Sequence, residues 1–244
     1  MTLFFLSLFL PLFCRAWAAP VHFKASDGVA IAADFRPPAK RKPVFLLLHG
    51  LGSSRGEWSL LVSSLTARGY GSLALDARGH GSSGGPPYAA FRTPEAWAAL
   101  ERDLDGALSY LERAGYPQRR VILAGASIGA NLALRAATGH ARIPFALLFS
   151  PGLDYQGITI EDQFRIWDKP VLLAAAPDDP YAMQTCQRLA AQAKSPESRL
   201  LQARKGHGVR MFEGPENQEF VRRLFEWIDR RVRASSPSGN PAFP

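Results

Sequence analysis

One serine, with a glycine two residues before it and another two residues after it, is the best candidate for a nucleophile in this sequence. Ser127 stands in the run Gly-Ala-Ser-Ile-Gly at residues 125–129, after four apolar residues and before an amphipathic stretch at 130–138. We predict a buried strand, a very tight turn and a helix, because so sharp a turn leaves no space for Cβ atoms two residues before and after the serine. The turn would expose the hydroxyl at the positive end of the helix. Small-residue turns are common, so Ser127 needs partners before it predicts catalysis.

His207 is the candidate base for Ser127. It lies between Gly206 and Gly208, shortly after an apolar run at residues 200–203. The two glycines give this loop the freedom to bend toward the serine. The other histidines lie in the first hairpin, beside glycine loops upstream of Ser127, or after the helix that follows it: His22, His49, His80 and His140.

A base of this kind needs a carboxylate behind it, and three aspartates follow predicted strands. Asp178 and Asp179 follow the strand at residues 171–176, and Asp154 follows the strand at 145–149. We favour Asp179, because its distance from the strand end places it better to face the site; Asp178 and Asp154 are the alternatives. Asp179 also precedes Pro180, which suits a helix cap, and one loop residue can serve both purposes.

The elements that must position these groups alternate between short apolar runs and helical patterns. This alternation predicts an α/β domain with a mainly parallel sheet. Ser54 and Glu57 predict a capping box at the start of a helix. One small helix over the site is expected within residues 156–169. Strands are expected at residues 21–24, 29–35, 43–48, 72–75, 121–124, 145–149, 171–176 and 200–203, and the longer helices at 54–67, 93–114, 130–138, 181–193 and 216–232.

Five motifs together make residues 27–230 resemble the α/β-hydrolase superfamily, closest to small cap-less serine esterases and the serine aminopeptidase-like (monoglyceride lipase-like) branch. They are His-Gly-Leu-Gly-Ser-Ser at 49–54, Asp-Ala-Arg-Gly-His-Gly-Ser-Ser at 76–83, the Ser127 turn, Asp-Asp-Pro at 178–180 and Gly-His-Gly at 206–208. The resemblance implies a mostly parallel sheet of about eight strands flanked by helices. One departure is that the usual lid between the sixth strand and the acid strand is nearly absent here, so we expect a minimal lid. The resemblance also implies that the backbone N–H groups of Leu51 and Ile128 form an oxyanion hole, and that residues 78–81 form a structural loop near the site.

These residues predict a serine hydrolase of the carboxylesterase or lipase-like type. It would cleave a carboxylic ester of a small or medium acyl substrate through Ser127, His207 and Asp179, with an acyl-enzyme intermediate. One alternative is a peptidase or amidase with the same triad, and another is a non-catalytic fold that binds a ligand or partner. We expect no cofactor, and the sequence shows no metal-ligand spacing.

Size and composition suit one globular domain with termini of a different character. The chain has 244 residues, of which 47% are hydrophobic. Residues 1–18 read as a secretory signal peptide, apolar over 3–13 and ending in the small-x-small run Ala-Trp-Ala. We therefore predict a hydrolase domain at 19–234, a disordered tail at 235–244 and export to the periplasm or medium. The alternative is a membrane anchor formed by an uncleaved N-terminus.

The formal net charge is +8, and much of the excess occurs in short runs of basic residues. No nucleic-acid-binding motif accompanies these runs. Membrane contact is therefore expected only through the signal segment or a weak attraction of the basic surface. Removal of the signal, with Cys14, would leave Cys186 without a disulfide partner, and we predict that it is a small core residue.

Overall fold

A mostly parallel sheet is the centre of the computed structural model, which describes residues 18–235. Its eight strands lie in the order β1-β2-β4-β3-β5-β6-β9-β10, and those from β4 onward in this order are parallel. The α/β-hydrolase architecture predicted from the sequence is thereby confirmed. The strands are β1 Ala19–Lys24, β2 Ala30–Arg36, β3 Val44–Leu48, β4 Gly71–Leu75, β5 Val121–Ala126, β6 Ala146–Phe149, β9 Val171–Ala175 and β10 Arg199–Gln202, with β7 Asp154–Tyr155 and β8 Ile158–Thr159 as a separate small hairpin.

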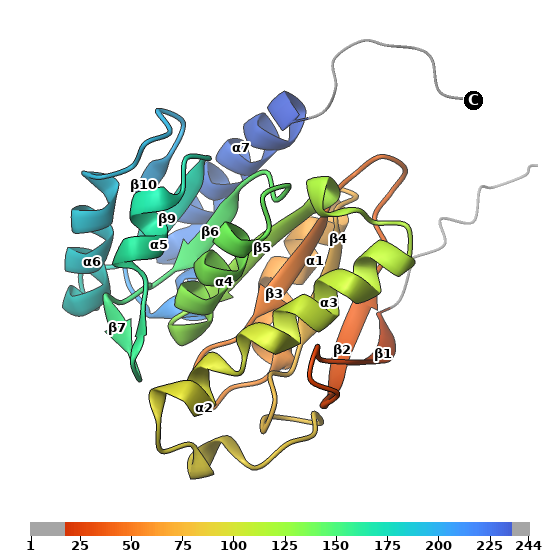
Figure 1. Ribbon diagram of the computed structural model, residues 1–244. Helices are drawn as coiled ribbons and strands as arrows, with labels where there is room; N and C mark the ends of the chain where they lie inside the picture. The colour runs from red at the N-terminus through yellow and green to blue at the C-terminus, as the bar shows by residue number, and fades with distance from the viewer. Residues whose placement is uncertain (1–17, 236–244) are drawn as a thin grey trace, which may run out of the picture.

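Helices cover both faces of the sheet (Figure 1). Apolar side chains of α3, α4, α5 and α6 pack against one face, and those of α1 and α7 pack against the other. The helices are α1 Ser59–Ala67, α2 Pro94–Ala98, α3 Glu101–Arg113, α4 Ile128–Gly139, α5 Glu161–Ile166, α6 Pro180–Ala190 and α7 Gln218–Ser235, with short 3-10 turns at Arg55–Trp58, Tyr88–Ala90, Gln118–Arg120, Gly208–Phe212 and Pro215–Asn217.

Burial on both faces explains why the central strands are continuous apolar runs. Every residue of β3 is buried, and alternate side chains belong to different cores. Leu46 packs on the α3 and α4 side, whereas Phe45 and Leu47 pack on the α1 and α7 side. A strand covered on both sides has no polar face, so its sequence shows no alternation.

Three local predictions need correction. The helix expected at 93–114 is divided into α2 and α3, because the N–H groups of Leu100, Arg102 and Asp103 each donate a hydrogen bond to the third residue back. The capping box does not form: the Ser54 side chain makes no cap hydrogen bond, and Glu57 accepts a hydrogen bond from Gly50 instead. The last helix continues through Ser235, the first residue of the predicted tail.

The segment at 156–169 does not place a helix over the site. Ile160 and Phe164 of this segment are buried in the core with α4, so α5 lies against α4. Asn131 of α4 explains this position, because its buried amide donates hydrogen bonds to the carbonyls of Gly152 and Ile158. Those bonds hold the β7–β8 hairpin to the helix and leave the ends of the strands uncovered by α5.

A buried guanidinium ties the loop after β4 to the first hairpin. Arg78 donates to both carboxylate oxygens of Asp27, at 2.7 and 2.8 Å, and to Asp103 of α3 at 2.8 Å. The hydrogen bonds from Arg78 hold the pKa of Asp27 well below its usual range. Paired in this way, the charges fix the loop that carries His80 toward the site.

The remaining sequence expectations at the two ends fall mostly outside the described residues. The predicted signal segment is described only at Ala18, and residues 236–244 of the predicted tail are not described. Cys186 lies on α6, fully buried and without a disulfide, which confirms its prediction as a core residue. No described helix has the length and apolar composition needed to cross a membrane.

Two glycines in helices give opposite predictions for the same substitution. In α3, a Cβ at Gly106 would lie 2.4 Å from the carbonyl oxygen of Lys24, so Gly106→Ala should lower the free energy of unfolding by about 1–3 kcal/mol through overpacking. At Gly139, the last residue of α4, a Cβ meets nothing within 4 Å. There Gly139→Ala should be neutral or stabilising by up to about 1 kcal/mol. Urea denaturation measures both; equal effects of the two substitutions would contradict the packing of α3 on β1.

Candidate active site

Ser127 lies at the apex of a strained turn between β5 and α4. Its φ of 55° is unusual for a residue with a side chain, and its N–H is held by the carbonyl of Phe149 at 2.8 Å. A Cβ at Gly125 would lie 2.0 Å from the carbonyl oxygen of Gly129, and one at Gly129 would lie 2.4 Å from that of Leu48. The predicted steric reason for both glycines is therefore confirmed.

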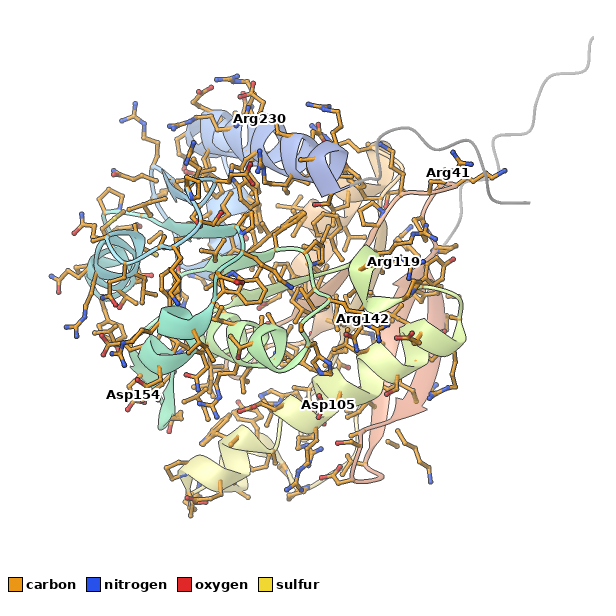
Figure 2. The ribbon with its side chains drawn as sticks, turned by 45° about the horizontal axis from the view of Figure 1, so that its top comes forward. Arg41, Asp105, Arg119, Arg142, Asp154 and Arg230 are labelled. Carbon is orange, nitrogen blue, oxygen red and sulfur yellow. The ribbon has the colours of Figure 1, made fainter. Side chains whose placement is uncertain are left out.

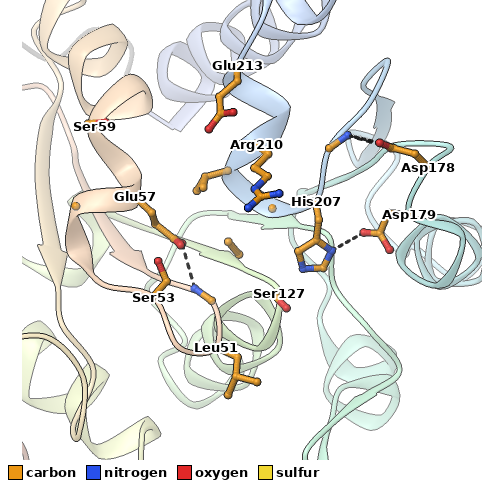
Figure 3. Close-up of a pocket in the computed structure, with 16 residues that line it drawn as sticks. Leu51, Ser53, Glu57, Ser59, Ser127, Asp178, Asp179, His207, Arg210 and Glu213 are labelled. Carbon is orange, nitrogen blue, oxygen red and sulfur yellow. Dashed lines mark hydrogen bonds and ion pairs between the residues drawn. The ribbon is translucent and has the colours of Figure 1, made fainter.

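His207 and Asp179 are in direct contact. Nδ1 of His207 lies 2.6 Å from Oδ2 of Asp179 (Figure 3). The other oxygen of Asp179 accepts a hydrogen bond from the N–H of Ala182 at 3.3 Å, so the same carboxylate caps α6. With Nδ1 donating to a carboxylate, Nε2 is the ring nitrogen that can accept a proton.

One pocket brings Ser127, His207 and Asp179 together. It has a volume of about 720 Å³ and opens at the edge of the sheet where β3, β5, β9 and β10 end. In the described structure the side chains of Ser127 and His207 make no hydrogen bond with each other. Contacts between a nucleophile and its base are often long before substrate binds and shorten in the reacting complex.

The two alternative aspartates have other partners. Both carboxylate oxygens of Asp178 accept the N–H of Gly206, at 2.9 and 3.0 Å, so this residue holds the start of the His207 loop. Asp154 accepts the N–H of Gly157 at 2.7 Å inside the turn of the β7–β8 hairpin. Of the three aspartates, the structure brings only Asp179 into contact with His207.

The loop that carries His207 depends on its glycines and on a buried serine. Gly206 and Gly208 have φ values of 106° and 58°. A Cβ at Gly208 would lie 3.2 Å from that of Ala126, which precedes the nucleophile. The N–H of Gly208 donates to the hydroxyl of Ser150 at 2.9 Å. The backbone beside His207 is therefore fixed against the strand that ends at Ser127.

The loop after β3 is held by three side chains. The N–H of Gly50 donates to Glu57 at 3.0 Å, its carbonyl accepts from Nδ1 of His49 at 2.7 Å, and the N–H of Gly52 donates to Nε2 of His80 at 3.3 Å. Burial raises the pKa of the Glu57 carboxyl, whereas its hydrogen bonds with Ser53 and Gly50 oppose that rise. Residues 50–53 thus have a defined backbone conformation beside Ser127.

Two backbone N–H groups next to the nucleophile have no acceptor. Among the described residues, the N–H of Leu51, in the loop after β3, makes no hydrogen bond. The N–H of Ile128, at the start of α4, makes none either. These are the two donors that the resemblance to hydrolases indicates, and their neighbours Gly50 and Gly52 are both engaged.

The two histidines near this loop are neutral hydrogen-bonding groups. His49 donates from Nδ1, and its Nε2 accepts the N–H of Ala77 at 3.0 Å. His80 likewise donates from Nδ1 to the carbonyl of Arg78 and accepts from Gly52. Burial lowers the pKa of His49 to about 4 and also lowers that of His80. A proton on Nε2 would remove the acceptor on which each backbone N–H depends.

Two side chains at this site were missed from the sequence. Glu57, which lines the pocket, was assigned to a helix cap. Tyr155, in the β7–β8 hairpin, donates to the carbonyl of Ser150 at 3.3 Å. Burial and the charge of Asp179 raise the pKa of Tyr155, and a hydrogen bond with the side chain of Ser127 opposes the rise. The Gln-Gly pair at 156–157 was the signal for this hairpin turn.

The described residues contain no group of three or more His, Cys, Asp or Glu side chains arranged to hold a metal ion. The arrangement that is present joins a strained serine, an imidazole with an acceptor nitrogen and two unpaired N–H donors. Such a set can perform acyl transfer.

Comparison with known proteins places the chain among hydrolases. A family model described as serine aminopeptidase, S33 matches residues 39–194. A search of curated protein sequences found no match.

Solved structures share the fold at low sequence identity. An esterase of Pyrococcus furiosus superposes with a TM-score of 0.75 at 20% identity, over 88% of this chain and 92% of that one. Est1E of Butyrivibrio proteoclasticus, solved with ferulic acid, gives 0.73 at 17% identity over 87% and 100%. An esterase of Exiguobacterium antarcticum gives 0.68 at 14% identity over 88% and 100%.

The buried His49 predicts a loss of stability in mild acid. Its pKa is about 4 in the folded chain and about 6.5 in an unfolded one. The unfolded chain therefore binds the proton first, and stability should fall as the pH decreases from about 6.5 to 4, by up to about 3 kcal/mol. Urea denaturation across this range measures the slope. His49→Gln should flatten it, whereas His22→Gln, at an exposed position on β1, should not; equal slopes in all three proteins would refute the assignment.

Proposed function

This chain belongs to the serine aminopeptidase S33 family of α/β-hydrolases, and on that premise we propose that it hydrolyses carboxylic esters of small or medium acyl groups. The observation that carries the proposal is the 2.6 Å contact of His207 with Asp179 in the same pocket as the Ser127 turn. A serine, an oriented imidazole and two unpaired N–H groups are the parts that acyl transfer needs.

In the proposed mechanism, Oγ of Ser127 attacks the ester carbonyl while Nε2 of His207 takes its proton. The carbonyl oxygen gains negative charge, which the N–H groups of Leu51 and Ile128 stabilise; one such donor contributes roughly 3 kcal/mol. His207 returns the proton to the leaving alcohol, and an acyl-serine remains. Water then gives its proton to His207 and attacks the acyl carbonyl carbon. The bond between this carbon and Oγ of Ser127 breaks, the carboxylic acid leaves, and His207 returns the proton to Oγ. Asp179 holds the imidazole tautomer and stabilises its protonated form throughout.

Pocket size and cover support a small or medium substrate. A volume of about 720 Å³ falls in the range of sites that enclose small molecules. The segment that could cover the site is short, and α5 within it packs on α4. Leu51, at the pocket wall, is 48% exposed. An open site of this kind admits esters from solution without movement of a lid domain.

A peptidase or amidase is the second candidate, and one observation favours it. Glu57 and Glu213 both line the pocket, and a carboxylate there could bind the free amine of a substrate. One oxygen of Glu57 already accepts the N–H of Gly50, which ties this carboxylate to the loop. Ester hydrolysis therefore remains the first proposal, and a panel of matched aminoacyl esters and amides would decide between them. A binding protein without turnover is disfavoured by the strained, unoccluded serine.

The primary test measures turnover of short-chain p-nitrophenyl esters together with labelling by a fluorophosphonate. Ser127→Ala should abolish both. Asp179→Asn should lower kcat by roughly 10⁴-fold, because the imidazole loses its orienting carboxylate. Asp178→Asn is the matched control, since this neighbour contacts Gly206, and it should retain activity within about tenfold. The proposed triad would be refuted if the Ser127→Ala variant still hydrolysed the esters. It would also be refuted if Asp178→Asn and Asp179→Asn lowered kcat equally.

Substitutions of Glu57 separate a positioning role from substrate binding. If Glu57 positions Leu51 through the N–H of Gly50, Glu57→Leu should lower kcat for esters about 10- to 100-fold with little change in KM, because the donor acts on the transition state. Glu57→Gln keeps an oxygen acceptor and should restore most of kcat. For a substrate with a free amine bound by the carboxylate, Glu57→Gln would instead raise KM. Equal kcat losses for Leu and Gln would contradict the positioning role.

A further inference from the structure

Exposed cations gather at the edge of the sheet opposite the pocket. The loops before the parallel strands and the C-terminal turns of α1, α3 and α7 form this edge, which we name the basic edge. Its five loops at 37–43, 116–120, 140–144, 167–170 and 194–198 contain eight Lys or Arg residues and two acids. Among the described residues, several exposed cations here have no ion pair: Arg41, Arg113, Arg119, Arg142, Lys194 and Arg230.

The strand register shows that these loops share one edge. Val44 of β3 pairs with Gly71 and Val121, the first residues of β4 and β5. Ala146 and Val171 pair at the starts of β6 and β9. Figure 2 shows Arg41 and Arg119 on one side of the molecule, Arg142 nearer its middle, and Asp154 on the other side. The positive charge is therefore separated from the pocket by the length of the sheet.

The chain also enters the fold at the basic edge. Ala19, the first residue of β1, pairs with Phe35, and Arg36 at the end of β2 pairs with Ser72 near the start of β4. In the sequence, the apolar run 3–13 comes shortly before Ala19. In the alternative in which the N-terminus is not cleaved, a run that favours lipid joins the domain where its unpaired cations are concentrated.

Helix dipoles account for only part of this charge. Cations in the last turn of a helix are stabilised by the partial negative charge of its C-terminus, which suits Arg113 and Arg233. Arg41 and Arg142 lie in loops, and Arg119 lies in the 3-10 turn that leads into β5. Since no acid pairs with these three side chains in the described structure, they are available to an external anion.

We propose that the basic edge docks on an anionic lipid surface. Cations on separate loops along one edge can all contact a broad charged plane, and each Lys or Arg near such a surface adds to the attraction. Docking in this way turns the pocket away from the lipid, so the enzyme would receive its substrate from the aqueous side. This goes beyond the proposed ester hydrolysis and does not depend on it.

The test is sedimentation of the full-length protein with vesicles of phosphatidylcholine alone or mixed with phosphatidylglycerol. Wild type should bind the mixed vesicles more tightly, and salt should weaken this preference. The variant Arg41→Glu/Arg119→Glu/Arg142→Glu should lose the preference by roughly 100-fold or more. The control Lys24→Glu/Arg204→Glu/Arg223→Glu makes the same change in net charge at exposed positions on the pocket side. It should keep most of the preference for anionic vesicles.

Each outcome decides the proposal. Loss in the first variant alone, with unchanged thermal unfolding, supports docking through the basic edge. Equal losses in both variants would show a general effect of net charge and overturn it. Absence of any preference for anionic vesicles in wild type would also overturn it. Tighter binding to duplex DNA than to anionic vesicles at the same salt would assign the edge to nucleic acid instead.

Discussion

The close approach of α4 to the end of β3 is the constraint on which the site depends. Gly129 lies so near the carbonyl oxygen of Leu48 that a methyl group would overlap it. That contact seats the first turn of α4 against the sheet and forces Ser127 into a positive φ. The strain is offset by the core that α4 builds with its neighbours. The position of the nucleophile is therefore set by packing of the whole layer, and not by the loop alone.

Parallel strands explain why distant parts of the chain meet at this serine. The loops after β3, β5, β9 and β10 all leave the same edge. Each loop then needs its own restraint, and three of the four restraining side chains are buried or partly buried, whereas Asp178 is exposed. His49 and Glu57 hold the loop after β3, Ser150 holds the His207 loop, and Asp178 fixes its entry. The stability of the site therefore depends on groups that do not take part in acyl transfer.

The sequence predicted what local sterics and chain order determine. The glycines around Ser127 and the strand runs each have one dominant physical interpretation. Asp179 was favoured over Asp178 and Asp154 only by its distance from the strand end. Prediction from the sequence failed where one pattern of residues is compatible with two structures. Ser54 and Glu57 have capping-box spacing, yet the N–H of Gly50 is the donor that Glu57 satisfies. Tyr155 approaches Ser127 only because Asn131, more than twenty residues earlier, anchors the hairpin to α4. Such a tertiary contact has no signature in a single sequence.

The neighbouring residues Asp178 and Asp179 have the same side chain but different roles in the site. Asp179 is at the N-cap of α6, and one of its carboxylate oxygens accepts a hydrogen bond from the N–H of Ala182. The second oxygen is thereby aimed at His207, and a helix start also stabilises the negative charge that the imidazole needs beside it. Asp178, one residue earlier, is outside the helix and reaches the backbone of Gly206. Asp178 restrains the His207 loop, and Asp179 orients the imidazole ring. The roles differ because only Asp179 occupies the N-cap position of α6.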